Sequence, residues 1–341
     1  MVVSYKQYIK NKFSTGIILA LILLIAIILS INTGNVKFGI FKLFSVFFRF
    51  EDDPTLLHIL LNIRLPRVVN ALLAGAALSV SGAIMQNLLK NPLASPFTLG
   101  ISHGAVFGAA VAITLNKGVF LSYSIYTVVF FAFIGALLTM LIILLIGAIK
   151  GFSAYVVILA GVGLSSLFAS LTMLLQYFSS DEEVAAIVFW TFGDLNKTTW
   201  NEIYIILLIT IPALIYFILK SPQYNITIWD DATAESLGIN VKMLKITGLL
   251  LTCLITAAIV SFMGIIGFIG LISPHIIRLI IGNDHRFLLP YSIILGSTIL
   301  LFSDIIGRII LTPATIPVGI ITSLLGVPVF FYILLKNKGT I

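Results

Sequence analysis

Residues 122–149 read SYSIYTVVFFAFIGALLTMLIILLIGAI, an unbroken apolar run without a charged side chain. A helix needs about 20 such residues to cross the hydrocarbon core of a bilayer, whereas a strand of a membrane barrel needs only about 10. Backbone polar groups within lipid are satisfied only in helices or in closed barrels. The length of this run therefore predicts a membrane-spanning α-helix.

The composition of the whole chain agrees with this class. Of its 341 residues, 60% are hydrophobic and 10% are charged, whereas a soluble domain keeps about a quarter of its residues charged. The lone cysteine, Cys253, lies in an apolar run and excludes a disulfide framework. The net charge of +7 comes from single basic residues between apolar runs, which indicates membrane topology and not nucleic-acid binding. We expect an all-α membrane protein in contact with lipid.

Ten membrane spans are predicted from the apolar runs. They cover approximately residues 16–32, 65–85, 94–115, 122–149, 154–177, 201–219, 244–263, 267–282, 288–309 and 317–335. The first follows a basic start without a small-x-small cleavage site, which favours an uncleaved helix over a signal peptide. The range 94–115 starts in a stretch rich in Pro and Ser, and 267–282 is short for a crossing.

The distribution of basic residues predicts the orientation. With the N-terminus inside, the inner segments hold twelve Lys and Arg residues, and the outer segments and helix mouths hold eight. This bias follows the positive-inside rule. It predicts cytoplasmic N- and C-termini in a multi-pass protein of the cell membrane, and an even number of spans agrees with it.

Two segments between the spans are longer than a turn. The outer segment 33–63 carries an aromatic run from Phe38 to Phe50 that we expect in the membrane interface. The inner segment 220–243 contains a predicted short helix, with Asp230 or Asp231 as N-cap and Gly238 as C-cap. A second short helix is expected to lead into the next span. Docking to a soluble partner explains such an ordered segment, and a passive surface elbow is the alternative.

No catalytic or nucleotide-binding motif is present. The sequence lacks a phosphate loop, a Gly-x-Ser-x-Gly elbow and a His-Glu-x-x-His pair, so we expect no enzyme activity, no cofactor and no metal site. Asp304 and Arg308 lie four residues apart and can pair on one helix face. His275 is expected to bond backbone carbonyls freed by Pro274, and His103 stands alone. An ion-coupled secondary transporter is expected to carry a series of acidic residues within its spans. The sequence offers Asp304 alone, so this class is poorly supported.

Two interruptions rich in Gly and Pro occupy corresponding parts of the two halves. They read Asn91-Pro-Leu-Ala-Ser-Pro96 and Gly264-Ile-Ile-Gly-Phe-Ile-Gly-Leu-Ile-Ser-Pro274. Broken helices at membrane depth line cavities or pack against protein and do not face lipid. The pattern predicts internally repeated halves around a central pathway, with ordinary close packing of small residues as the alternative.

Several motifs, in order along nearly the whole chain, resemble those of the FecCD-type permeases. They are Ile63-Arg-Leu-Pro-Arg67, Ala74-Gly-Ala-Ala-Leu-Ser-Val-Ser-Gly-Ala-Ile-Met-Gln86, Asn91-Pro-Leu-Ala94, Gly267-Phe-Ile-Gly-Leu-Ile-Ser-Pro-His-Ile-Ile-Arg278, Ala314-Thr-Ile-Pro-Val-Gly319 and Gly326-Val-Pro-Val-Phe330. The resemblance implies a membrane subunit of an ATP-binding-cassette (ABC) importer. Its expected partners are an ATPase dimer, an extracytoplasmic substrate-binding protein and a second permease, identical or paralogous. Ferric siderophore is the favoured substrate, and haem and cobalamin remain open.

The resemblance also assigns roles to residues of this sequence. The resemblance assigns docking of the binding protein to Arg64, Arg67 and Arg308. For Arg64 and Arg67, anchoring to lipid headgroups is the alternative. Coupling to the ATPase falls on the segment 230–243, with Asp230, Asp231, Glu235, Leu237 and Gly238. The cytoplasmic gate falls on Asn91, Leu93, Ser153 and Ala154. The segment Ser179 to Asn196 matches an outer re-entrant helix.

Overall fold

The structure is a computed structural model that describes residues 5–34, 53–115 and 125–336. In these ranges the chain is nearly all helical, and an isolated bridge between Phe192 and Ile265 is the one β-type pairing. The fold class predicted from composition and helix-length apolar runs is confirmed.

A helix lies in each of the ten predicted ranges. The elements are α1 (Tyr5–Asn32), α3 (Pro54–Ile59), the π-helical turn η1 (Leu60–Arg64), α4 (Leu65–Leu88), α5 (Ile101–Leu115), α6 (Ile125–Lys150), α7 (Ala154–Tyr177), α8 (Asp181–Thr191), α9 (Trp200–Thr227), α10 (Asp231–Ser236), α11 (Val241–Met263), α12 (Ile269–Ile281), α13 (His285–Ile310) and α14 (Val318–Lys336). Among them, seven helical segments are long and apolar enough to cross a membrane. The helices α5, α12 and the described part of α14 are shorter. Ten membrane crossings therefore stay a prediction.

Helix α4 is the centre of the bundle. It packs against α13, α11, α12 and α9, and nearly all of its side chains are buried. Small residues allow these contacts: a Cβ atom on Gly82 would lie 1.7 Å from the carbonyl oxygen of Gly270, and one on Gly75 would lie 2.5 Å from the backbone of Ser297. Helices in lipid associate through such close packing because lipid provides no hydrophobic drive between them.

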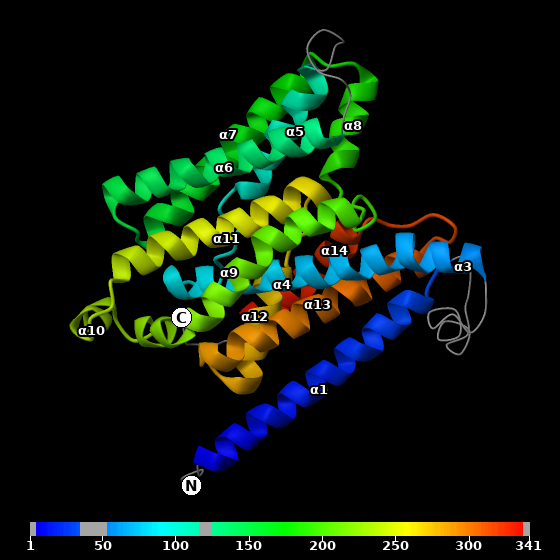
Figure 1. The fold of residues 1–341 in the computed structure, drawn as a ribbon. Coiled ribbons are helices and arrows are strands. Elements are labelled where there is room, and N and C mark those ends of the chain that lie inside the picture. Colours follow the sequence, from blue (N-terminus) through cyan, green and yellow to red (C-terminus); the bar gives the residue numbers. More distant parts are fainter. Residues whose placement is uncertain (1–4, 35–52, 116–124, 337–341) are drawn as a thin grey trace.

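The long helices run side by side and give the bundle two ends (Figure 1). Helices α1 and α13 are parallel, since Tyr291 donates to Lys12 O at 3.0 Å near their starts and Arg308 donates to Ser30 O at 2.9 Å near their ends. We call the end with α10 and the start of α1 the inner end, and the end with α3 and α8 the outer end. These names follow the predicted orientation, which stays a prediction.

The segment after α9 differs from the prediction. Residues 220–227 continue α9 and do not begin a separate cytoplasmic segment, because Tyr224 and Thr227 are buried against the end of α4. The predicted second short helix is also absent. Helix α11 begins directly at Val241, where the Asn240 side chain caps it by accepting from Met243 N at 2.9 Å.

The described part of the outer segment 33–63 is helical from Pro54 and runs into α4. Asp53 starts this helix by accepting from Leu56 N at 3.0 Å. The wider turn η1 precedes Pro66, whose missing N–H would interrupt an α-helical ladder. The predicted interfacial run Phe38 to Phe50 lies outside the described residues.

Both predicted interruptions are non-helical where the two short helices begin. Residues 90–100 form turns, so α5 begins at Ile101 and not at 94, since Pro92 and Pro96 cannot donate to a helical ladder. Residues 264–268 separate α11 from α12, and Phe268 has a left-handed φ of 67°. The sequence pattern therefore located both breaks but placed the first helix start too early.

We expect Gly82→Ala to destabilise the bundle by about 2 kcal/mol or more, since the added methyl group would overlap the Gly270 backbone. The apparent melting temperature of the purified protein in detergent measures this. Gly163→Ala is the matched control, since its Cβ atom would meet nothing within 4 Å and alanine favours a helix. Equal melting temperatures for both variants would contradict the packing described for α4.

Candidate functional site

The two interruptions meet in the middle of the bundle around a small cavity. Ser95, Pro96 and Phe97 line it from the first break, and Ile266 and Phe268 from the second. Its volume of about 20 Å³ holds roughly one water molecule. The two breaks therefore lie against each other, but this cavity is far too small for a metal chelate, and the central pathway stays a prediction.

Backbone hydrogen bonds join the second interruption to the outer helix α8. Ile265 N donates to Thr191 O at 3.2 Å, and Asp194 N donates to Met263 O at 2.8 Å. Gly319 N, at the start of α14, donates to Gly193 O at 3.0 Å. The loop after α8, the break before α12 and the start of α14 thus form one junction made of main-chain groups.

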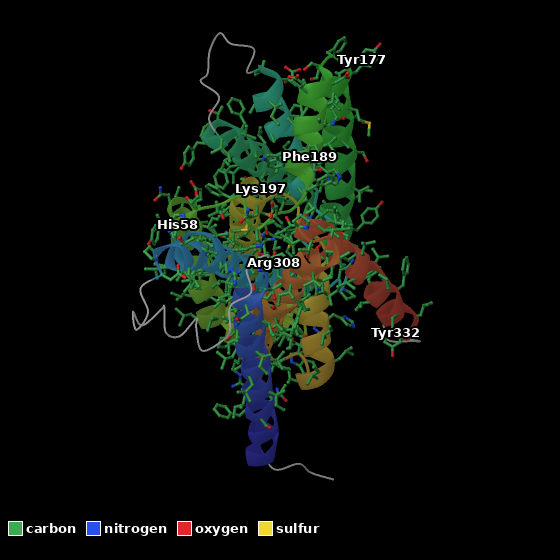
Figure 2. All side chains as sticks on the ribbon, turned by 90° about the vertical axis from the view of Figure 1, so that its right-hand side faces the viewer. His58, Tyr177, Phe189, Lys197, Arg308 and Tyr332 are labelled. Atoms are coloured by element: carbon green, nitrogen blue, oxygen red, sulfur yellow. The ribbon has the colours of Figure 1, made fainter. Side chains whose placement is uncertain are left out.

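Helix α8 lies within the predicted outer re-entrant segment Ser179 to Asn196. Ser180 and Glu183 form a capping box at its start, with Ser180 N donating to the Glu183 carboxylate at 2.9 Å. Phe189 of α8 and Tyr177 of α7 project from the periphery of the bundle (Figure 2). Phe189 is 68% exposed, which leaves an apolar outer surface on this helix.

A buried ion cluster lies at the outer end. The Arg67 Nε atom donates to Asp304 Oδ1 at 2.8 Å, and the Arg308 Nη2 atom lies 2.8 Å from Asp304 Oδ2. The predicted pairing of Asp304 with Arg308 is therefore present. The Asp304 residue is 2% exposed. One carboxylate between two guanidinium groups joins α4 to α13.

Arg308 and Arg64 hold the end of α1. Arg308 Nη1 donates to Ser30 O at 2.9 Å and to Thr33 O at 2.7 Å, and Arg64 donates to Ile31 O. Figure 2 shows Arg308 where α1 ends. These carbonyls are the orphan acceptors of a helix C-terminus, which cationic side chains satisfy well.

The positions of Arg64, Arg67 and Arg308 differ from the expectation that they face the outer mouth. Each is 8% exposed or less, because each finds partners inside the chain. Their role in docking stays a prediction.

At the inner end, α10 follows the predicted cap pattern. Asp230 is the N-cap residue, and Gly238 follows Leu237 with φ 81°. Glu235 is exposed, and apolar side chains flank the helix: Trp229 is 85% exposed, Leu237 64% and Met243 56%. The segment 230–243 thus presents an apolar surface with acidic residues beside it.

Asp231 connects α10 to two other elements. Its carboxylate lies 3.1 Å from the Nζ atom of Lys90, at the end of α4, and accepts from Lys245 of α11. Partial burial would raise the pKa of Asp231, but the two ammonium groups hold it below its ordinary value. The carboxylate therefore stays ionised at neutral pH.

The predicted gate residues lie near the inner end on two separate elements. Asn91 Oδ1 accepts from Leu93 N at 2.8 Å, and Leu93 is 43% exposed. Ser153 is the N-cap of α7 and accepts from Val156 N at 3.3 Å, beside half-buried Ala154. Within the part of the chain that the structure describes, no hydrogen bond joins the first pair to the second.

Polar contacts near the gate tie α9 to its neighbours. Asn87 donates to Tyr224 O at 3.1 Å and accepts from Thr227 Oγ1 at 3.1 Å. Asn225 donates to Asp284, the N-cap of α13, at 2.7 Å. Partial burial would raise the pKa of Asp284, but hydrogen bonds from Arg286 and Asn225 lower it to about 2.

The profile of the FecCD transport family matches residues 22–336. The chain belongs to this family. It is 45% identical to an ABC transporter permease protein of Methanocaldococcus jannaschii, over 97% of both chains. It is 36% identical to the hemin transport system permease protein HmuU of Yersinia pestis, over 94% of this chain and 96% of HmuU. An inward-facing structure of a metal-chelate type ABC transporter superposes with a TM-score of 0.83 at 29% identity, covering 96% of this chain and 99% of that one.

Membership of the FecCD family makes the chain a multi-pass membrane permease of an ABC importer. Among the described residues no group of three or more His, Cys, Asp or Glu side chains is placed to hold a metal ion.

Two residues of this site have no signal in the sequence. Lys90 precedes the first interruption and Phe268 lies in the second; they are the non-glycine residues with positive φ in the described chain, and no residue pattern reveals such a conformation. The predicted bond of His275 to freed carbonyls was wrong. Pro274 frees the carbonyl of Gly270, but Gln86 approaches that oxygen at 3.5 Å from α4, whereas the His275 Nε2 atom has no partner in the described residues.

Replacing Asp304 by Asn should destabilise the permease by about 3 kcal/mol, since Arg67 and Arg308 would stay buried without their counter-ion. Thermal unfolding in lipid nanodiscs measures the loss. Glu182→Gln, on the exposed first turn of α8, is the control and should change stability by about 0.5 kcal/mol or less. Unchanged unfolding of the Asp304 variant would refute a stabilising role for the cluster.

Proposed function

We propose that this FecCD permease imports a ferric siderophore, delivered by an outer binding protein and driven by an ATPase dimer at the inner end. Likeness to a metal-chelate type transporter supports a ferric chelate, whereas likeness to the permease HmuU, named for hemin, supports the haem alternative. Haem and cobalamin importers are the alternatives within the family. The observation that carries the ATP-driven reading is the exposed surface of the segment 230–243.

The segment 230–243 suits an ATPase because it combines an exposed helix with bulky apolar side chains. Trp229 and Leu237 are well exposed on either side of α10, and Asp230 and Glu235 add acidic groups. Large exposed apolar side chains rimmed by polar groups are typical of a protein interface. The coupling residues Asp230, Asp231, Glu235, Leu237 and Gly238 would thus form the docking surface.

The state of the intramembrane acid favours ATP over an ion gradient. The described long helices carry acidic residues in their first turns or not at all, with the exception of Asp304 within α13. Its carboxylate is engaged by Arg67 and Arg308, so it is not placed to take up a proton or a sodium ion. A secondary transporter needs such a group along its pathway.

The docking role of Arg64, Arg67 and Arg308 is proposed from the family resemblance, and their guanidinium groups suit acidic side chains on a partner. Charges at the rim of an interface set its orientation and association rate more than its affinity. Docking through these residues requires the outer end to open, because all three are buried in the present conformation.

Substrate would pass between two permease subunits and not through one. The cavity between the interruptions holds about one water molecule, whereas the gate residues Leu93 and Ser153 are exposed and so can face a second subunit. The second subunit is either an identical copy or a paralogue. On ATP binding, movement of the segment 230–243 would shift the gate near Asn91 and expose the pathway to the other side.

An uptake experiment tests the proposed function. In proteoliposomes holding the permease, its ATPase and its binding protein, we expect ATP-dependent uptake of a ferric siderophore at least tenfold above that of haem or cobalamin. Vesicles without the ATPase provide the control. Uptake driven by an ion gradient in those vesicles would overturn the ATP-driven mechanism, and preferred uptake of haem or cobalamin would correct the substrate.

Arg64→Gln should slow association of the binding protein about tenfold and weaken the dependence of its rate on salt. Electrostatic steering depends on charges that are exposed or that become exposed when the outer end opens. Arg64 is chosen because Arg67 and Arg308 hold Asp304. Stopped-flow association with the reconstituted importer measures the rate. Lys150→Gln at the inner end is the control. An unchanged association rate for Arg64→Gln would refute its part in docking.

A further inference from the structure

The last turn of α4 has a geometry that glycine usually adopts. Lys90 N donates to Asn87 O at 3.1 Å, and Asn91 N donates to Gln86 O at 3.1 Å, the pair of bonds that closes a helix through a left-handed residue. Lys90 is that residue, with φ 47°. A left-handed conformation is unfavourable for a residue with a Cβ atom.

Other helices of this chain place glycine where they end at positive φ. Gly151 follows α6, Gly238 follows α10, Gly264 follows α11 and Gly282 follows α12. In the described chain, α4 departs from this pattern by placing a lysine there. A side chain that strains its own backbone indicates a compensating contact or a functional constraint.

The compensating contact is the ion pair with Asp231. The Lys90 Nζ atom lies 3.1 Å from Asp231 Oδ1, while Lys245 binds the other carboxylate oxygen. Asp231 is the first residue of α10, and Lys90 directly precedes the predicted gate residue Asn91. One ion pair thus bridges the coupling segment and the gate.

A second contact of α4 is buried and is made with α9, the helix that precedes α10. The Asn87 amide bonds both Tyr224 O and Thr227 Oγ1 at the end of α9, just before α10, and Asn87 is 8% exposed. The Lys90 and Asp231 side chains are 44% and 35% exposed. The buried contact is costly to break, whereas a partly exposed ion pair separates more easily. The end of α9 is therefore fixed to α4, while the pair between Lys90 and Asp231 can open.

We propose that Lys90 and Asp231 are positioning residues that transmit movement of α10 to the cytoplasmic gate. The inference rests on the proposed docking of an ATPase at the segment 230–243. When the ATPase displaces α10, Asp231 leaves Lys90, and the backbone at Lys90 relaxes from its left-handed conformation. Asn91 and Leu93 follow directly in the chain and change position with it.

The stabilisation by the ion pair and the cost of the left-handed conformation are of similar size, as a switch requires. An exposed ion pair contributes little to stability, and a left-handed residue costs a comparable amount. A small displacement of α10 therefore suffices to change the preferred conformation of the turn. A simpler role for Lys90 is interaction with the carbonyls that end α4, which would need no link to α10.

Lys90→Gly separates these two roles. Glycine relieves the strained turn but removes the ion pair, so we expect an unchanged or higher melting temperature with weaker coupling. In proteoliposomes of the complete importer, the number of substrate molecules imported per ATP hydrolysed should fall at least fivefold. Asp231→Asn should give the same fall, and Lys90→Arg should stay within twofold of the wild type. Lys150→Gln is the control for loss of an inner-end lysine.

The outcomes distinguish this inference from the proposed function. A ratio for Lys90→Gly within twofold of the wild type overturns the inference, and if that variant does not assemble, Asp231→Asn decides by the same limits. A lower melting temperature and ratio for Lys90→Gly beside normal coupling in Asp231→Asn would assign Lys90 a purely structural role and also overturn it. Failure of the wild-type permease to bind an ATPase would overturn the proposed function itself, and the inference with it.

Discussion

Close contact between backbones along α4 is the constraint on which the bundle depends. Gly75 and Gly82 let α13 and α12 approach until main-chain atoms touch, and α4 thereby becomes the axis around which the other helices pack. This arrangement places both ends of α4 beside residues with predicted roles. Its outer end carries Arg67 in the ion cluster, and its inner end leads through Lys90 to the predicted gate.

The two ends use charge in opposite ways. At the outer end Asp304 is enclosed by two guanidinium groups and shielded from water, so its contacts resist salt and are costly to separate. At the inner end Asp231 is shared between two lysines, of which Lys90 is the more exposed, so that water can replace this partner more easily. The first arrangement stabilises the packing of α4 against α13, and the second suits a contact that is made and broken.

Apolar runs and helix-breaking Gly and Pro residues predicted much of this fold, because both are local properties of the sequence. The helix α7 and the breaks near Asn91 and Gly264 follow from them. Contacts between distant segments decided the rest. The extension of α9 to Thr227 depends on Asn87 of α4, and the burial of Arg64 depends on carbonyls at the end of α1. The left-handed turn at Lys90 depends on a carboxylate far along the chain, which no local pattern contains.

The junction between α8, the second interruption and α14 has a further consequence for how such permeases can diverge. Its bonds run between main-chain groups of residues such as Gly193, Ile265 and Gly319. Main-chain groups are the same whatever side chain a residue carries, so substitutions on the outward surface of α8 leave the attachment intact. The exposed surface near Phe189 can therefore change without loss of the main-chain bonds that attach the outer helix.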